Sequence, residues 1–387
     1  MNVLITDLNI ALDGHKLGFV QNTINYISQN KNKHRFYILV NNSSTFKLSD
    51  PGKEWISIEY LSTEEQGTID SQTGFLKKAA AQWKCIKSFA KQHNIKHLVL
   101  LELDPYQLEI GKAKTPFTIG GIWFRPYARM LPETNTFKAR QKNRIIRLQK
   151  AATMKFALSN SKLKQVFILN DENMPNWLNG SKKRFFHLPD PWFAYQKLED
   201  YKLRESFDIP EDNVVFLQFG FIDERKNTEN IISALNSLPA EVAKKVSLLI
   251  VGKFKPDYEK ELKSLKKTTS KYQLKTKNEF VSDEEMEAIF SQSDVIIRMN
   301  LNFYGSSGIV GIAAVHHKPV IVSDKGVMAE QVEKYKLGKL ANPVNTNEIA
   351  QVISEFVNEP KLREISGKGY LDSHTVAKFA ETLLQIP

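Results

Sequence analysis

The chain contains a single cysteine, Cys85, among 387 residues, so no disulfide can form within it. A lone thiol of this kind fits a reducing compartment, where it packs as a small apolar side chain. No run of about 18 apolar residues occurs, so the sequence predicts no membrane-spanning helix. Residues 1–7 lack the basic start of a signal peptide and are expected to form a strand. These features favour a cytoplasmic protein.

Common catalytic signatures are missing as well. There is no His-Glu-x-x-His, no paired Cys-x-x-Cys and no Gly-Lys-Ser/Thr phosphate loop. His316 and His317 are neighbours on one element, so their side chains point apart and are poorly placed to share a metal ion. The sequence therefore predicts neither a metal site nor a bound cofactor.

Basic residues outnumber acidic ones, which gives a formal net charge of +11. A surplus of this size indicates an anionic partner, which could be a sugar nucleotide, an acidic glycan, a lipid headgroup or a nucleic acid. Because no groove-reading motif accompanies the charge, we expect no nucleic-acid partner. With 42% apolar residues the chain is globular, and its length favours two domains.

Strand-like and helix-like runs alternate along the whole chain, which predicts an α/β fold with doubly wound parallel sheets. In the first half we expect helices at about 15–29, 74–93 and 137–152. The expected strands of the first half are 3–7, 35–40, 56–61, 97–101, 117–123, 155–159 and 163–169. Those of the second half are 214–219, 246–251, 275–281, 295–298 and 319–323, each followed by a helical pattern.

Residues 303–308 read Phe-Tyr-Gly-Ser-Ser-Gly and precede a helical pattern, a short turn and an apolar strand. The first turn of a helix has free N–H groups and the positive end of the helix dipole, and Ser306 and Ser307 add hydroxyl donors. A diphosphate fits such a site. The alternative is that Ser307 caps the helix for the helix's own stability.

A second segment, residues 214–220, is a β-rich apolar run that ends in Gly220 and is followed by Arg225 and Lys226. Two cations therefore lie beyond the carboxyl end of a strand, where open α/β sheets bind ligands. The spacing from Gly220 to Lys226 resembles that of the large family of retaining nucleotide-sugar glycosyltransferases with the GT-B fold, family 4-like or group 1. The order of this loop, the serine-glycine helix and the strand after Lys318 resembles that family as well.

The resemblance covers about residues 185–360 and implies the GT-B architecture, in which two Rossmann-like domains face a cleft. Residues 1–190 are expected to form the acceptor-side domain and residues 191–370 the nucleotide-sugar domain, with a hinge at about 185–195. Residues 371–387 are expected to form a helix that crosses back to the first domain.

The resemblance also implies roles for particular residues. Lys226 is expected to act in catalysis and, with the free N–H groups of the helix, to neutralise the leaving diphosphate without a metal. The diphosphate is further held by Gly220, Ser306, Ser307 and Gly308. Tyr304 and Gly305 are expected beside the donor sugar, and Phe280 and Val281 beside the base.

The sequence departs from the family at three positions. Phe221 stands where the family has an arginine, and the nearby Arg225 is the expected replacement. Tyr304 and Ile312 stand where the family commonly has two glutamates that contact the sugar and the ribose. Neither side chain can accept hydrogen bonds as a carboxylate does. The alternative is therefore a catalytically silent relative that binds a nucleotide, a glycan or a partner transferase.

Two segments of the first half are candidate acceptor sites. Gly14 and His15 lie in a glycine-containing loop between the first strand and its helix, where backbone N–H groups can approach a ligand closely. The alternative is a plain strand-to-helix turn. Arg125 follows a strand within an aromatic cluster and could pair with a phosphate or carboxylate. The alternative is that this arginine has a purely structural role.

The helix expected at 137–152 is basic and amphipathic. Phe137, Ile145, Leu148 and Ala152 form an apolar stripe, and the cations around it are Lys138, Arg140, Lys142, Arg144, Arg147 and Lys150. Such a helix can lie on an anionic membrane surface. Alternatively, it covers a sheet and exposes a solvated basic face. We therefore expect a glycosyltransferase that takes a nucleotide-sugar donor and a glycan or lipid-linked acceptor, in surface polysaccharide or glycolipid synthesis.

Overall fold

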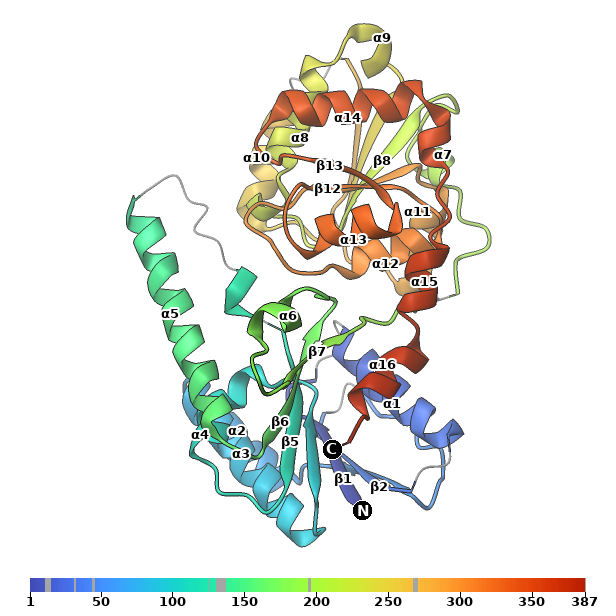
Figure 1. Ribbon diagram of the computed structural model, residues 1–387. Helices are drawn as coiled ribbons and strands as arrows, with labels where there is room; N and C mark the ends of the chain where they lie inside the picture. The colour runs from blue at the N-terminus through green and yellow to red at the C-terminus, as the bar shows by residue number, and fades with distance from the viewer. Residues whose placement is uncertain are drawn as a thin grey trace. The chain divides into compact units, whose positions relative to one another are not determined.

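The computed structural model describes residues 1–10, 15–30, 33–43, 46–124, 126–129, 137–193, 196–266 and 271–386. The chain divides into two compact units (Figure 1). Unit 1 consists of Met1–Asp190 and Val376–Pro387, and unit 2 of Pro191–Thr375. The last helix of the chain therefore belongs to the first unit, as the GT-B resemblance implied.

Unit 1 is built on a parallel sheet of seven strands within the described residues, in the order β3-β2-β1-β4-β5-β6-β7. Its strands are β1 (Asn2–Asp7), β2 (Arg35–Val40), β3 (Ile56–Tyr60), β4 (His97–Leu100), β5 (Thr118–Trp123), β6 (Leu163–Leu169) and β7 (Phe185–Leu188). Its helices are α1 (His15–Gln29), α2 (Thr63–Asp70), α3 (Phe75–Gln92), η1 (Asp104–Tyr106), α4 (Gln107–Lys112), η2 (Tyr127–Arg129), α5 (Phe137–Ser159), α6 (Met174–Leu178) and α16 (Val376–Leu383).

Both faces of this sheet are covered by helices. Residues of α2, α3, α4, α5 and α6 join the strands in one apolar core, with Trp83 of α3 as a large buried side chain. On the other side α1 packs beside α16 (Figure 1). There the rings of Phe19 and Phe379 stack with centroids 5.0 Å apart. The C-terminal helix is thus tied to unit 1 by its own apolar face.

Unit 2 repeats the architecture, and its described residues form a six-stranded parallel sheet in the order β10-β9-β8-β11-β12-β13. Its strands are β8 (Val214–Phe219), β9 (Val246–Val251), β10 (Gln273–Lys277), β11 (Val295–Arg298), β12 (Val320–Ser323) and β13 (Gly338–Ala341). Its helices are α7 (Leu203–Ser206), η3 (Glu224–Lys226), α8 (Thr228–Ser237), α9 (Ala240–Ala243), α10 (Pro256–Lys266), α11 (Asp283–Gln292), α12 (Gly308–Val315), α13 (Val327–Tyr335), α14 (Thr346–Asn358), η4 (Pro360–Arg363) and α15 (Lys368–Ser373).

The central strands β8 and β9 of unit 2 are apolar on both faces because helices cover both. In β8, Val214 and Phe216 pack in a core with α8, α10 and α14, whereas Val215 and Leu217 pack in a core with α11, α12 and α13. Side chains alternate between the two faces of a strand, so a strand that is covered on both faces requires a continuous apolar run. This is the physical basis of the strand pattern that the sequence shows.

The two sheets share one topology, in which strand order reverses between the first and fourth strands. The reversal lies between β1 and β4 in unit 1 and between β8 and β11 in unit 2. Open α/β sheets bind ligands at the carboxyl ends of the strands that flank such a reversal. Each unit therefore has a defined place at which to look for a site.

Several sequence-based element boundaries are wrong. Residues 155–159 are not a strand but the end of α5, where Met154 and Ala157 face the core with helical spacing. The strand expected at 275–281 ends at Lys277. Strands β7 and β13 were not expected, since both are short and only partly buried. None of the described helices is both long and apolar enough to cross a bilayer.

Candidate functional site

Lys226 lies in the loop after β8, at the end of the short helix η3, and its side chain is only 7% exposed. Its Nζ donates to the carbonyl of Phe219, the last residue of β8, at 3.0 Å. Gly220 makes room for this approach, because a Cβ atom there would lie 3.1 Å from the same Nζ. The φ of +108° at Gly220 also disfavours any residue with a side chain. The structure thus brings Gly220 and Lys226 together.

Buried polar contacts hold this loop in place. The side chain of Gln218 donates to the carbonyl of Lys226 at 2.8 Å and accepts from the hydroxyl of Thr228 at 2.8 Å. Asn227 adopts a left-handed conformation, with φ of 63°, and donates to the carbonyl of Pro343 at 2.6 Å. The ammonium group is therefore fixed at the end of β8.

The surroundings of Lys226 lower its pKa from 10.5 to about 7. Burial is the main cause, because it penalises the charged form. The positive charges of Arg298 and Arg225 lower this pKa further, and the carboxylate of Asp223 opposes them. In these surroundings a bound anion would stabilise the charged form of Lys226.

Arg225 points into solvent, with its side chain 73% exposed. Its Nε and Nη2 contact Oδ2 of Asp223 at 2.8 and 2.7 Å, and its backbone N–H donates to Oδ1 of Asp223 at 3.1 Å. The charge of Arg225 is therefore matched by an acid of its own loop. Phe221, where the family has its arginine, is exposed. A catalytic role for Arg225 stays a prediction.

The loop after β11 lies against the loop of Lys226. The N–H of Leu301 donates to the carbonyl of Arg225 at 2.8 Å. Farther along, the hydroxyl of Ser323 at the end of β12 donates to the carbonyl of Asn300 at 3.0 Å. The loops that follow β8, β11 and β12 therefore meet at one edge of the sheet.

The serine-glycine segment enters α12 as the sequence predicted, with Ser307 at the N-cap position and Gly308 as the first helical residue. The side chain of Ser307 is buried, yet it makes no capping hydrogen bond. Within the described chain, the backbone N–H groups of Ser306 and Ser307 donate no backbone hydrogen bond either. Ser307 therefore does not cap the helix, and its polar groups are available to an anion at the helix N-terminus.

Arg298, the last residue of β11, was not singled out from the sequence. Its Nε and Nη1 are buried and have no hydrogen-bond partner among the described residues. Burial is the main reason why the pKa of Arg298 falls to about 10, and the charge of Arg225 adds to it, so Arg298 stays cationic near neutral pH. A signal was present in the sequence, since a lone arginine ends an otherwise apolar strand.

The residues expected beside the sugar and the base lie in neighbouring loops. Tyr304 and Gly305 precede α12, and the N–H of Val327 at the start of α13 donates to the carbonyl of Tyr304 at 3.0 Å. Phe280 is 82% exposed, and Val281 is buried, in the segment between β10 and α11. Contacts of these residues with a sugar and a base stay predictions.

Ile312 cannot replace a carboxylate, because its side chain packs against the apolar core beneath α12. The position eight residues earlier holds the phenol side chain of Tyr304. The structure therefore offers no carboxylate at either position where the family commonly has a glutamate.

In unit 1 the reversal of strand order carries a charged cluster. Lys16 of α1 contacts Glu102, which follows β4, and its Nζ lies 3.5 Å from Oδ2 of Asp7, the last residue of β1. Asp7 is buried, and this raises its pKa although Lys16 opposes the effect. The cluster stands at the strand ends where an acceptor site is expected.

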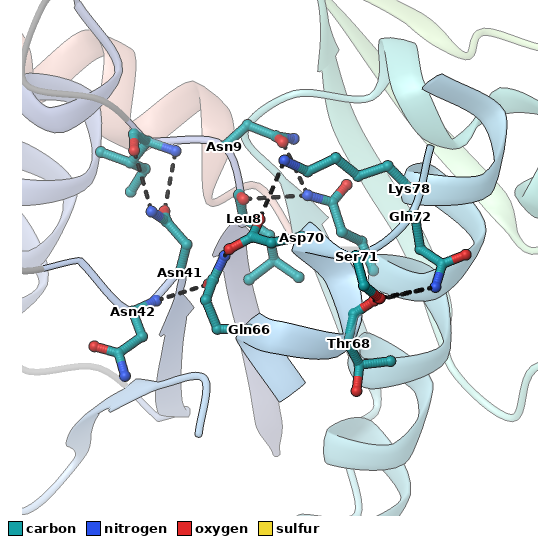
Figure 2. Close-up of polar contacts among 12 residues, drawn as sticks. Leu8, Asn9, Asn41, Asn42, Gln66, Thr68, Asp70, Ser71, Gln72 and Lys78 are labelled. Atoms are coloured by element: carbon teal, nitrogen blue, oxygen red, sulfur yellow. Dashed lines mark hydrogen bonds and ion pairs between the residues drawn. The ribbon is translucent and has the colours of Figure 1, made fainter. Parts of the chain in front are cut away.

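Amide side chains order the neighbouring backbone (Figure 2). Gln82 of α3 donates to the carbonyl of Leu8 at 3.2 Å and to Oδ1 of Asn9 at 2.8 Å. Asn41, which follows β2, accepts from the N–H of Ile10 at 3.0 Å and donates to its carbonyl at 3.2 Å. These contacts fix the segment that leaves β1.

The acceptor-side predictions fall largely outside what the structure describes. Gly14 and Arg125 lie outside the described residues. His15 begins α1, but its side chain also lies outside the described part. Their roles stay predictions.

The basic helix α5 does not cover the sheet with its predicted apolar stripe. Ile145 and Leu148 are 54% and 59% exposed, and Met154 and Ala157 face the core instead. Beyond Ile145 and Leu148, a pocket of about 240 Å³ lies between α3, α4 and α5. Its lining includes Phe75, Leu76, Pro105, Leu108, Trp123 and Lys150.

Metal-binding geometry is not found in the described ranges, where no group of three or more His, Cys, Asp or Glu side chains could hold an ion. The two adjacent histidines have separate partners. His316 contacts Glu287, and Nδ1 of His317 contacts the carbonyl of Ser366 at 2.6 Å.

Comparison with known proteins points to one class. Residues 200–369 match the profile of the family described as glycosyl transferases group 1. Comparison with curated protein sequences finds no significant match. The match lies within unit 2 and contains Lys226, Arg298 and the start of α12.

Solved structures show the fold of the whole chain. WaaG, a glycosyltransferase involved in lipopolysaccharide biosynthesis, is 14% identical, with 99% of this chain and 100% of that chain covered and a TM-score of 0.65. Sucrose-phosphate synthase from Thermosynechococcus elongatus is 12% identical, with 99% and 96% covered and a TM-score of 0.69. HepE from Anabaena, solved with UDP, is 14% identical, with 100% and 98% covered and a TM-score of 0.64. These structures show that the fold is GT-B.

Proposed function

We propose that the chain transfers a sugar from a nucleotide diphosphate sugar to a hydroxyl acceptor, with retention at the anomeric carbon and without a metal ion. The observation that carries the proposal is Lys226, a buried cation held at the carboxyl end of β8 beside Gly220. It lies in the segment that matches the glycosyltransferase family and next to the loop that leads to α12.

The chemistry follows from where negative charge develops. As the bond between the anomeric carbon and the phosphate oxygen breaks, the electron pair passes to the diphosphate. Lys226 and the polar groups at the start of α12 stabilise that charge. The acceptor oxygen forms the new bond on the same face of the sugar, and its proton passes to an oxygen of the diphosphate. This route requires no carboxylate base.

The test is a turnover assay with a panel of UDP- and GDP-sugars in the presence of EDTA. Lys226→Ala is expected to lower turnover about a hundredfold or more, as the loss of one preorganised donor to a developing anion does. The anomeric configuration of the product is read by NMR. Activity that appears only with added manganese or magnesium contradicts the metal-free mechanism.

A second candidate function is a catalytically silent relative that binds a nucleotide, a glycan or a partner transferase. The observation that favours it is the pair Tyr304 and Ile312, which stand where the family commonly has carboxylates. Under this proposal, nucleoside diphosphates bind and depend on Lys226, but no donor is hydrolysed or transferred. The turnover assay distinguishes the two functions.

For the acceptor, we propose a glycan or lipid-linked molecule used in surface polysaccharide or glycolipid synthesis. The exposed Ile145 and Leu148 lie on α5 among the exposed cations Lys142, Arg144 and Arg147. Each such cation adds about 1 kcal/mol of attraction near an anionic membrane. Helix α5 thus gives unit 1 a peripheral contact with the inner face of a membrane, and the nearby pocket with Phe75 and Leu76 suits the apolar part of a lipid.

Vesicle sedimentation tests the membrane contact. The protein is expected to bind vesicles rich in phosphatidylglycerol, and Ile145→Ser with Leu148→Ser should weaken binding at least about fivefold, since two apolar side chains no longer insert. Val344→Ser is the matched control, because Val344 is an exposed apolar residue of unit 2. Equal binding of the double variant and wild type rules out α5 as the contact.

A further inference from the structure

Arg298 stands at the reversal of strand order in unit 2, where β8 and β11 run side by side. Their register pairs Ile296 with Leu217. Two residues farther along these strands lie Arg298 and Phe219, the last residues of β11 and β8. The carbonyl of Phe219 is the acceptor for Nζ of Lys226. Lys226 and Arg298 therefore both lie at the carboxyl end of the strand pair β8 and β11.

The side chain of Arg298 lies on the face of the sheet that α12 covers. Side chains alternate along a strand, and Ile296 packs in the core that contains Val310 and Ala313 of α12. Ile297 packs in the opposite core. Arg298 therefore shares its face with the helix whose N-terminus carries the free serine groups.

The two cations lack a neutralising acid of their own. Arg298 forms no ion pair within the described residues, and its Nε and Nη1 have no hydrogen-bond partner there. Asp223, which acts on both cations, is already paired with Arg225. An unpaired buried charge is unfavourable, so this arrangement suits an occupied site. The diphosphate of a nucleotide sugar carries two negative charges, which the two cations match.

We propose that Arg298 and Lys226 together bind the diphosphate of the donor, and that Arg298 takes the place of the family arginine that is absent at Phe221. The inference rests on the proposed function and assigns a residue to its donor site. A guanidinium donates from two nitrogens in a fixed fork and so fits phosphate oxygens. Arg225 affects the site only through its electrostatic field, because its guanidinium is already paired with Asp223.

Isothermal titration of the full chain with UDP-glucose, GDP-mannose, UDP and GDP tests the assignment. For each of these probes that binds wild type, Arg298→Met should weaken binding about thirtyfold, because hydrogen bonds between charged groups are lost. Arg298→Lys should recover part of the loss, since it restores the charge without the fork. Arg225→Met tests the rival assignment and, if Arg298 is the phosphate ligand, should change affinity by less than about threefold.

Thermal unfolding without ligand separates a binding role from a structural one. Arg298→Met should unfold at a higher temperature than wild type, because it replaces an unpaired buried charge by an apolar side chain. Its stabilisation by UDP should nevertheless be smaller, since binding stabilises a protein according to affinity. If Arg298 instead supports the fold, its replacement lowers the unfolding temperature. Lower stability of the unliganded variant therefore overturns the assignment.

The outcomes distinguish this inference from the proposed function. If wild type binds a probe, Lys226→Ala weakens it and Arg298→Met does not, Arg298 is not a phosphate ligand although the donor site stands. If wild type binds none of the four probes, both proposals fail. If Arg225→Met causes the larger loss, the missing arginine is replaced by Arg225 and the inference is wrong.

Discussion

The affinity for a nucleotide sugar should fall as the pH rises from 6 to 9, because Lys226 loses its proton in the unliganded protein. Its pKa is lowered to about 7, mainly by burial; the charges of Arg298 and Arg225 add to this effect, and Asp223 opposes it. UDP-glucose is the suitable probe, since its diphosphate is a diester whose charge does not change in this range. The protonated fraction of Lys226 then controls binding.

The magnitude follows from that pKa. A group with a pKa of about 7 is roughly nine-tenths protonated at pH 6 and about one-tenth protonated at pH 8. If the bound state requires the charged lysine, affinity should fall about tenfold between these values and about tenfold again by pH 9. Titration calorimetry at constant ionic strength measures the slope.

Stability of the unliganded protein should change in the opposite direction. The folded-state pKa of Lys226 is lower than the unfolded value, so the unfolded chain binds more protons between pH 7 and 10.5. Unfolding free energy should therefore rise with pH in this window. The fall from 10.5 to about 7 sets an upper limit of about 5 kcal/mol for this gain.

Lys226→Met is the control for both trends. It should bind weakly at every pH, and this rise of stability between pH 7 and 10.5 should be missing. A wild-type affinity that stays constant from pH 6 to 9 would refute the reasoning, because it would show that Lys226 is fully charged without ligand or lies outside the donor site.

Further predictions concern Gly252, which follows β9 and lies against Gly220, and Ser307 at the start of α12. Gly252→Ala should destabilise the protein by about 3 kcal/mol or more in urea unfolding, because φ is +132° and a Cβ would lie 2.0 Å from the carbonyl oxygen of Gly220. Gly67→Ala in α2 is its control and should gain up to about 1 kcal/mol, since the added Cβ would meet no atom within 4 Å other than its chain neighbours and the backbone of its own helix. Equal effects at the two positions would contradict this view of the loop. Ser307→Ala should change stability by less than about 0.5 kcal/mol, because its hydroxyl makes no capping bond, and should weaken UDP-glucose binding about fivefold. A loss of stability without a loss of binding would restore the capping role.

The sequence was sufficient for elements whose local pattern and burial agree. Strands β8, β9 and β11 begin and end as predicted, because each is a short apolar run with both faces buried. The order of strands and helices along the chain was enough to predict doubly wound sheets. The cation Lys226 and the start of α12 were also placed from the sequence, since a strand end and a helix start are local features.

Local pattern failed where tertiary contacts choose between alternatives. Residues 155–159 were expected to form a strand, but α5 continues through them because Met154 and Ala157 meet the core only with helical spacing. The stripe with Ile145 and Leu148 looked like a buried face. In the structure Ile145 and Leu148 lie on the surface, and Met154 and Ala157 of the same helix are buried.

Arg298 shows most clearly what only the tertiary structure decides. It is 72 residues from Lys226 in the sequence, and nothing in the spacing connects them. The parallel register of β11 with β8 brings the two cations to one strand end, and the alternation of side chains turns Arg298 towards α12. The sequence alone determined that a cation follows β8 and that a polar loop precedes a helix. Which charges share one low-dielectric site depends on strand order, because the distance and burial that govern electrostatic energy exist only once the sheet has formed.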